Sequence, residues 1–167
     1  MPASDQGVFR ERYSLIPRTL IFLTRADKVL LLKGAPDKKL WANLYNGVGG
    51  HIERGEDVIT AARRELLEET GLQADALRLC AVVTIDTGED VGIGIYVLRG
   101  ECTEGEPLPS HEGALEWIAI EELAGLPLVE DLPVLLPRVL ALPPDAAPLS
   151  AVYGYDQAGK LVIRFGQ

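Results

Sequence analysis

The segment that most constrains this chain is an acidic helix that follows a run of glycines. Residues 46–50 read Asn-Gly-Val-Gly-Gly, and residues 56–70 have the composition of a helix. Since an α-helix turns by about 100° per residue, the i, i+3 and i+4 spacing of Glu65, Glu68 and Glu69 places them on one face. The sequence therefore predicts a rigid row of carboxylates next to a glycine-rich turn.

An apolar stripe lies beside this acidic face. It consists of Ile59, Ala62 and Leu66, and it can pack on a sheet. Most acidic helix faces are solvated surfaces, and neighbouring like charges repel one another. Here the acids adjoin the apolar stripe, which favours a binding role, because Mg²⁺ takes carboxylates together with waters and substrate phosphates. Both interpretations are open at this point.

The same segment, residues 50–72, resembles the Nudix box, G-x5-E-x7-R-E-U-x-E-E-x-G-U, in which U is a bulky aliphatic residue. Every fixed position is matched, by Gly50, Glu56, Arg64, Glu65, Leu66, Glu68, Glu69, Gly71 and Leu72. The resemblance implies a MutT-like Nudix hydrolase with an α/β/α sandwich, a mixed sheet and one acidic catalytic helix. Such enzymes use water to cleave a nucleoside diphosphate linked to another group.

The resemblance also implies roles for individual residues. The metal ligands would be Glu65, Glu68, Glu69 and the backbone carbonyl of Gly50. They would bind Mg²⁺, or alternatively Mn²⁺, and one of the glutamates, or a later one, would activate the water. The backbone of Gly49 and Gly50 would line the substrate site. Arg64 and Glu56 would hold the loop and the helix in register through an ion pair.

The segments around the box indicate the substrate. Residues 41–50 resemble a region of the purine nucleoside triphosphate diphosphatases that clear oxidised dGTP, where Asn46 would lie against the base. An amide offers both a donor and an acceptor to a purine edge. Asp131 aligns with one of two base-reading acids of those enzymes, although the second is Leu132 here and the preceding aromatic is Val129. Asp131 could instead cap the helix that follows.

Another acid and several other functions are also open. Glu112, five residues before Trp117, matches a carboxylate that often joins the metal site, but it could equally be a solvated loop residue. The substrate could be ADP-ribose, a dinucleoside polyphosphate or a nucleotide sugar. A non-catalytic Nudix module that binds nucleotide as a sensor is the alternative of another class. Such modules usually lose one or more box glutamates, and all three are present here.

The remaining segments predict strands around one strong helix. The expected strands are 18–24, 28–33, 77–86, 91–99, 114–119, 151–155 and 160–165, and the expected further helices are 120–125 and 133–141. Because strands and helices do not alternate regularly, a mixed-sheet α/β sandwich is favoured over a doubly wound sheet. A single domain over residues 1–167 is expected, with the helix and hairpin of 127–167 packed on it.

Composition limits the partners. The formal net charge is −9, which opposes binding to a nucleic acid polymer. The charge is uneven, because residues 1–49 sum to +4 whereas residues 101–131 hold nine acids and neither lysine nor arginine. Two cysteines without CxxC spacing favour the reducing cytoplasm. No apolar run approaches the roughly 20 residues of a membrane span. We expect a nucleotide as small-molecule partner, no membrane, and a monomer or homodimer.

Overall fold

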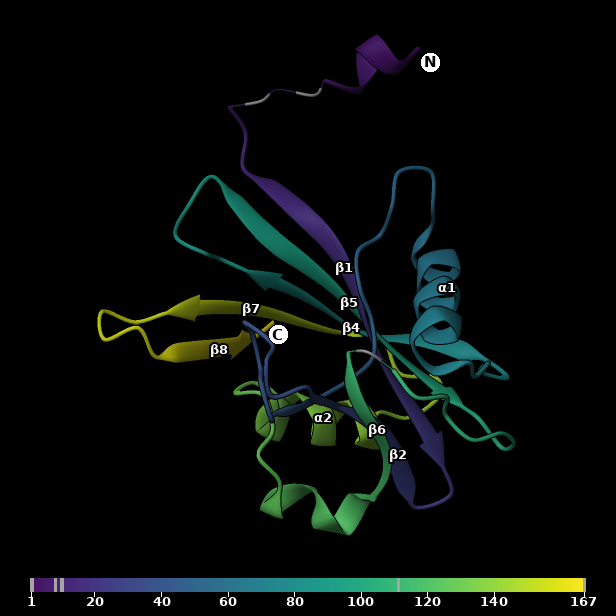
Figure 1. Cartoon of the computed structure of the whole chain (residues 1–167). Coiled ribbons are helices and arrows are strands. Elements are labelled where there is room, and N and C mark those ends of the chain that lie inside the picture. Colours follow the sequence, from purple (N-terminus) through teal and green to yellow (C-terminus); the bar gives the residue numbers. More distant parts are fainter. Residues whose placement is uncertain (1, 8, 10, 111, 167) are drawn as a thin grey trace.

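The computed structural model describes residues 2–7, 9, 11–110 and 112–166, and Figure 1 shows how its elements are arranged. Its strands are β1 (Ser14–Arg25), β2 (Lys28–Gly34), β3 (Tyr45–Asn46), β4 (Leu77–Ile85), β5 (Val91–Glu101), β6 (Gly113–Ala119), β7 (Leu149–Tyr155) and β8 (Leu161–Phe165). Its helices are α1 (Val58–Thr70), α2 (Leu132–Ala141) and two short 3-10 helices, η1 (Ala3–Gln6) and η2 (Ile120–Gly125). None of the helices in these described ranges is long and apolar enough to cross a membrane.

The strands form one mixed sheet. Its order is β3-β2-β1-β5-β4-β7-β8, and β6 pairs with β2. β1 runs parallel to β5 and β7 runs parallel to β4, whereas the sequential pairs β1–β2, β4–β5 and β7–β8 are antiparallel. Strands that were predicted next to one another in sequence thus pair as three hairpins. No regular βαβ alternation occurs in the residues that the structure describes.

The two helices cover opposite faces of this sheet, which the alternation along β1 makes clear. Ile21 and Leu23 join a buried cluster with Ala62 and Leu66 of α1, whereas Phe22 between them packs in a second cluster with α2. Successive side chains of a strand point to opposite faces, so the two clusters are the two sides of one sheet. Figure 1 shows α1 and α2 on different sides of the strands. The predicted α/β/α sandwich with a mixed sheet is confirmed.

The ends of α1 follow from its flanking residues. The Asp57 side chain accepts hydrogen bonds from the backbone N–H groups of Ile59 and Thr60, so the helix begins at Val58 rather than at Glu56. Gly71 ends it with a left-handed φ of 70°. Glu56 consequently lies in the loop before the helix, where its side chain can reach back to α1.

Helix α2 forms although Pro137 lies inside it. An interior proline costs about 3 kcal/mol, because it removes a backbone hydrogen bond. The helix buries four apolar residues, Leu132, Leu135, Leu136 and Val139. Each contributes about 1.5–3 kcal/mol of apolar burial, which is more than enough to offset the proline.

Strand β1 shares one of its edges between two partners. It pairs with β2 only at Thr24 and Arg25, close to the hairpin turn. Further back, the same strand makes isolated bridges between Ile21 and Val48 and between Arg18 and His51. The glycine-rich segment before α1 is thereby fixed alongside the middle of the sheet.

Candidate active site

Backbone hydrogen bonds hold the glycine turn against β1. The Thr19 N–H donates to the Gly50 carbonyl at 2.8 Å, and the Ile21 N–H donates to the Val48 carbonyl at 2.6 Å. Gly49 has a φ of 152°, and a Cβ there would overlap the backbone carbonyl of Thr19. The close approach of the two backbones therefore requires glycine at this position.

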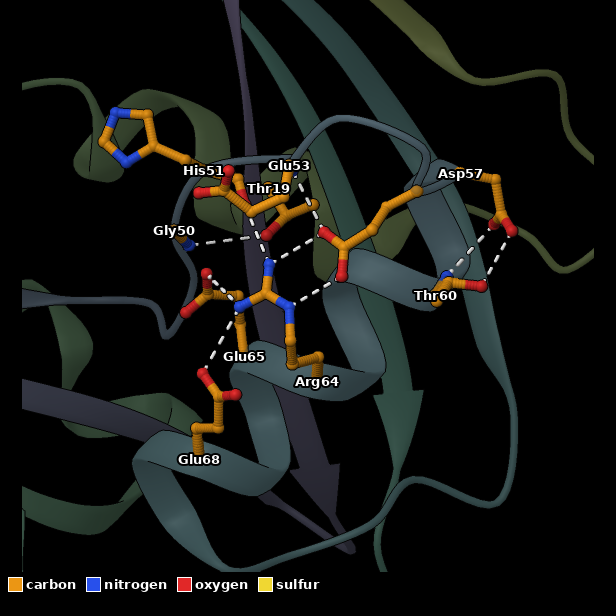
Figure 2. Close-up of polar contacts among 10 residues, drawn as sticks. Thr19, Gly50, His51, Glu53, Asp57, Thr60, Arg64, Glu65 and Glu68 are labelled. Atoms are coloured by element: carbon orange, nitrogen blue, oxygen red, sulfur yellow. Dashed lines mark hydrogen bonds and ion pairs between the residues drawn. The ribbon is translucent and has the colours of Figure 1, made fainter.

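Arg64 connects the loop to the acidic face of α1 (Figure 2). Its Nε and Nη2 donate to the two carboxylate oxygens of Glu56 at 2.7 and 2.8 Å, and Nη2 also donates to the His51 carbonyl at 3.1 Å. Its Nη1 donates to Glu65 at 2.8 Å and to Glu68 at 3.3 Å. The structure thus contains the expected Arg64–Glu56 ion pair. The structure also shows a contact that the sequence did not predict: the Arg64 guanidinium lies between Glu65 and Glu68 and offsets the repulsion between their charges.

Glu65 and Glu69 lie against the glycine turn. A Cβ on Gly50 would stand 2.5 Å from the carboxyl carbon of Glu65, so this carboxylate occupies the space left by the missing side chain. The Gly49 N–H donates to Glu69 at 3.3 Å. Burial is the main reason why the pKa of Glu69 is raised to about 7, and the negative charge of Glu65 raises it as well. The hydrogen bond from Gly49 and the positive charge of Lys38 act in the opposite direction and lower this pKa. The carboxylates of Glu65 and Glu69, both on α1, therefore contact the glycine turn at Gly50 and Gly49.

The donor set fits a hard divalent cation. Three carboxylates lie on adjacent turns of a rigid helix, and Glu65 and Glu68 already share one positive nitrogen of Arg64. The Gly50 carbonyl accepts a hydrogen bond from the Thr19 N–H, and a carbonyl oxygen has a second lone pair. In the described ranges, however, no three His, Cys, Asp or Glu side chains stand close enough together to surround an ion. The glutamates contact Arg64 or the backbone of the glycine turn instead.

Glu112 does not lie free in solvent, as one interpretation of the sequence had it. Its carboxylate forms an ion pair with Lys38, and both residues border the same pocket as Glu69. The positive charge of Lys38 also acts on Glu69 and lowers its pKa against the effect of burial. Lys38 therefore links Glu112 electrostatically to the box, although the sequence offered no signal for this lysine.

A single pocket of about 630 Å³ joins the box to the other candidate residues. Gly49, Gly50 and Glu69 line it together with Asn46 and Asp131. The Asn46 side-chain oxygen accepts a hydrogen bond from the Gly47 N–H at 2.8 Å, which fixes the orientation of the amide. Glu65 and Glu68 are not among the lining residues. Segments that are 85 residues apart in sequence thus meet in one cavity.

The structure does not support helix capping by Asp131. Asp131 precedes α2, but its side chain makes no capping hydrogen bond. Burial raises the pKa of this carboxyl, and Tyr153 from β7 lies close enough to interact with it. Asp131 is therefore a half-buried acid in the pocket wall.

Two residues of the pocket could not be predicted from the sequence. Tyr153 lies in β7 with only 2% of its surface exposed, and Arg18 lies in β1 beside the glycine turn. The Arg18 Nε is buried without a hydrogen-bond partner among the residues that the structure describes. Neither residue belongs to a local motif. The alternating pattern of strand residues could only have indicated that each faces one side of a sheet.

The comparisons with known proteins agree with the fold and with the box. Residues 15–139 match the NUDIX domain family. The chain is 35% identical over 106 residues to an oxidized purine nucleoside triphosphate hydrolase of Danio rerio, covering 63% of this chain and 67% of that protein. The mouse (Mus musculus) protein of the same name is 28% identical over the same lengths.

A solved structure gives the same result. The MutT protein of Bacillus halodurans superimposes with a TM-score of 0.76 and 25% identity, covering 90% of this chain and 97% of that one. The fold and the box define a Nudix protein, and the chain belongs to the NUDIX domain family. With all box residues present and relatives that are hydrolases, it is a Nudix hydrolase, as the sequence predicted.

Proposed function

We propose that this hydrolase cleaves an oxidised or otherwise non-standard purine (deoxy)nucleoside triphosphate to the monophosphate and pyrophosphate. Water attacks one of the two phosphorus atoms that the α,β-bridging oxygen joins, the bond from that phosphorus to the bridging oxygen breaks, and the products are the monophosphate and pyrophosphate. The observation that carries the proposal is the shared pocket. It is bordered at once by box residues Gly49, Gly50 and Glu69 and by Asn46 and Asp131, which can hydrogen-bond a base.

The box residues supply the catalytic part. We assign Glu65, Glu68, Glu69 and the Gly50 carbonyl to binding Mg²⁺ or Mn²⁺. Such an ion neutralises phosphate charge and lowers the pKa of bound water. Glu56 and Arg64 position this set, because Arg64 bonds the loop and two of the glutamates simultaneously. Arg64 thus acts as a positioning residue rather than as a group that touches substrate.

The rest of the pocket suits a nucleotide. Arg18 borders it beside the glycine turn with a guanidinium that makes no ion pair to a described residue, so its charge is available to a phosphate. Lys38 and Glu112 form the facing ion pair. Asn46 offers its amide and Asp131 its carboxyl group. The purine preference is further supported by the names of the Danio rerio and mouse relatives.

A hydrolysis screen tests the proposal. Substrates would be the standard nucleoside triphosphates, oxidised dGTP, ADP-ribose, a dinucleoside polyphosphate and a nucleotide sugar, each with Mg²⁺ and with Mn²⁺. We expect the highest kcat/KM for an oxidised purine triphosphate, with pyrophosphate as product. If ADP-ribose or a dinucleoside polyphosphate gave the highest value, the substrate assignment would be wrong while the hydrolase class stood. Nucleotide binding without turnover on any substrate would identify a sensor instead.

A further inference from the structure

Tyr153 carries a buried hydroxyl that makes no hydrogen bond of regular geometry to any residue that the structure describes. Tyr153 lies in β7, has only 2% of its surface exposed, and borders the pocket. Its oxygen has no hydrogen-bond partner of acceptable geometry among the described residues. A buried polar group without a partner is costly, and native structures retain such groups mainly where a ligand or water completes them.

The nearest charged group is the carboxyl of Asp131. Burial, the Asp131 charge and a hydrogen-bonding interaction with Asp131 raise the pKa of Tyr153, so the phenol keeps its proton at neutral pH. The two groups therefore lie within interaction range of each other in the pocket wall, although the contact does not have the distance and angle of a regular hydrogen bond. One side offers an O–H donor and the other offers carboxyl oxygens, both turned to the same cavity.

We propose that Tyr153 is a specificity-determining residue, which together with Asp131 binds an edge of the base that carries an acceptor beside an N–H donor. The Tyr153 hydroxyl donates to the acceptor, and the Asp131 carboxylate accepts from the N–H. A lactam edge, such as O6 and N1–H of a 6-oxopurine or O8 and N7–H of an 8-oxopurine, has this arrangement. The proposal rests on the proposed function and assigns its base recognition.

The substitution Tyr153→Phe tests the proposal, since it removes one oxygen and leaves the buried ring in place. Tyr96→Phe is the matched control, because that phenol packs on the opposite, α1-facing cluster. We expect Tyr153→Phe to raise KM for the best purine triphosphate by roughly tenfold, with kcat changed less than threefold. The loss is expected to fall below about twofold for unsubstituted purine deoxyriboside triphosphate, which lacks the N–H donor and the exocyclic acceptor.

A structural role for the hydroxyl would give a different result. Tyr153→Phe would then lower the melting temperature while leaving KM unchanged on every substrate, and that outcome would overturn the proposal. An equal loss on all triphosphates, with or without a polar base edge, would overturn it too.

Failure of the proposed function can be told apart by calorimetry with purine nucleoside monophosphates. If the wild type hydrolysed no triphosphate but bound a 6-oxopurine or 8-oxopurine monophosphate more weakly after Tyr153→Phe, the reaction would be wrong and the assignment of Tyr153 would stand. Unchanged binding of these monophosphates by Tyr153→Phe, in a wild type that does hydrolyse triphosphates, would refute the assignment alone.

Discussion

Replacing Gly50 with alanine tests whether the contact between the glycine turn and Glu65 is functional. An alanine Cβ would stand 2.5 Å from the carboxyl carbon and Oε1 of Glu65 and 2.6 Å from Oε2. Ordinary contact begins near 3.4 Å, so the carboxylate must retreat by about 1 Å. Because the obstructing atoms are the end of a flexible side chain, the fold can absorb the change. Gly50 has no left-handed φ that alanine would strain.

The expected result is a folded enzyme with poor catalysis. A misplacement of about 1 Å at a catalytic group costs on the order of 100-fold in rate. We therefore expect kcat/KM of Gly50→Ala to fall by roughly 100-fold on the best substrate of the screen, with a melting temperature within about 2 °C of wild type. Gly125→Ala is the control, since nothing lies within 4 Å of its Cβ position and its φ is not left-handed. Wild-type kcat/KM in folded Gly50→Ala would refute the role of the Glu65 position.

The neighbouring glycine should respond in the opposite way. A Cβ on Gly49 would overlap the Thr19 carbonyl, which belongs to the backbone of β1 and cannot turn aside, and its φ of 152° disfavours alanine. Such strain costs about 1–3 kcal/mol or more, which lowers the melting temperature of a chain of this size by several degrees. Thermal unfolding of Gly49→Ala beside Gly50→Ala would separate structural from catalytic glycines. Equal melting temperatures for the two variants would contradict the geometry.

Three further outcomes follow from the same site. Glu69→Gln should lower kcat by about 100-fold or more at saturating Mg²⁺ with an unchanged circular dichroism spectrum, and wild-type turnover would contradict the metal-site assignment. Asn46→Ala should raise KM for a purine substrate and leave the Mg²⁺ dependence in place; the reverse pattern in a metal titration would exclude base contact. Hydrogen bonds from Arg64 lower the pKa of Glu56 from its ordinary 4.5 to about 2. The Glu56 carboxylate therefore stabilises the fold above about pH 4.5, and this stabilisation is lost as the pH falls toward 2. Urea unfolding should accordingly show Glu56→Gln less stable than wild type at pH 7, with a gap that closes by pH 2; a constant gap, or one as small as that of Glu89→Gln, would contradict the ion pair's role.

The local elements were predictable because each has a local cause. Short runs of branched apolar residues specify β1 and β2, and Gly71 ends α1 through its left-handed conformation. The start of α1 was placed too early, since Asp57 caps the helix and leaves Glu56 in the loop. The two-residue strand β3 was missed, because it is too short to show any alternation.

The long-range parts of the site could not be predicted in the same way. The Lys38–Glu112 ion pair joins residues 74 positions apart, and Tyr153 reaches the pocket only because β7 adds to the edge of β4. No spacing in the sequence encodes these contacts, since they depend on the order of strands in the sheet. The sequence allowed Asp131 to be either a base-reading acid or the cap of α2. The structure was needed to choose between them, because it shows that the Asp131 side chain makes no capping hydrogen bond.

The fold brings residues from the basic and the acidic parts of the chain together in one pocket. Arg18 and Lys38 come from the basic residues 1–49, and Glu112 and Asp131 come from the acidic residues 101–131, yet all four border one pocket. At physiological salt, charges beyond about 8 Å are largely screened. Under the proposed function, we therefore expect an incoming triphosphate to meet these local groups rather than the net charge of −9. Lys38 is paired with Glu112, whereas Arg18 makes no ion pair within the part of the chain that the structure describes. We therefore expect Arg18 to be more available than Lys38 to a phosphate group.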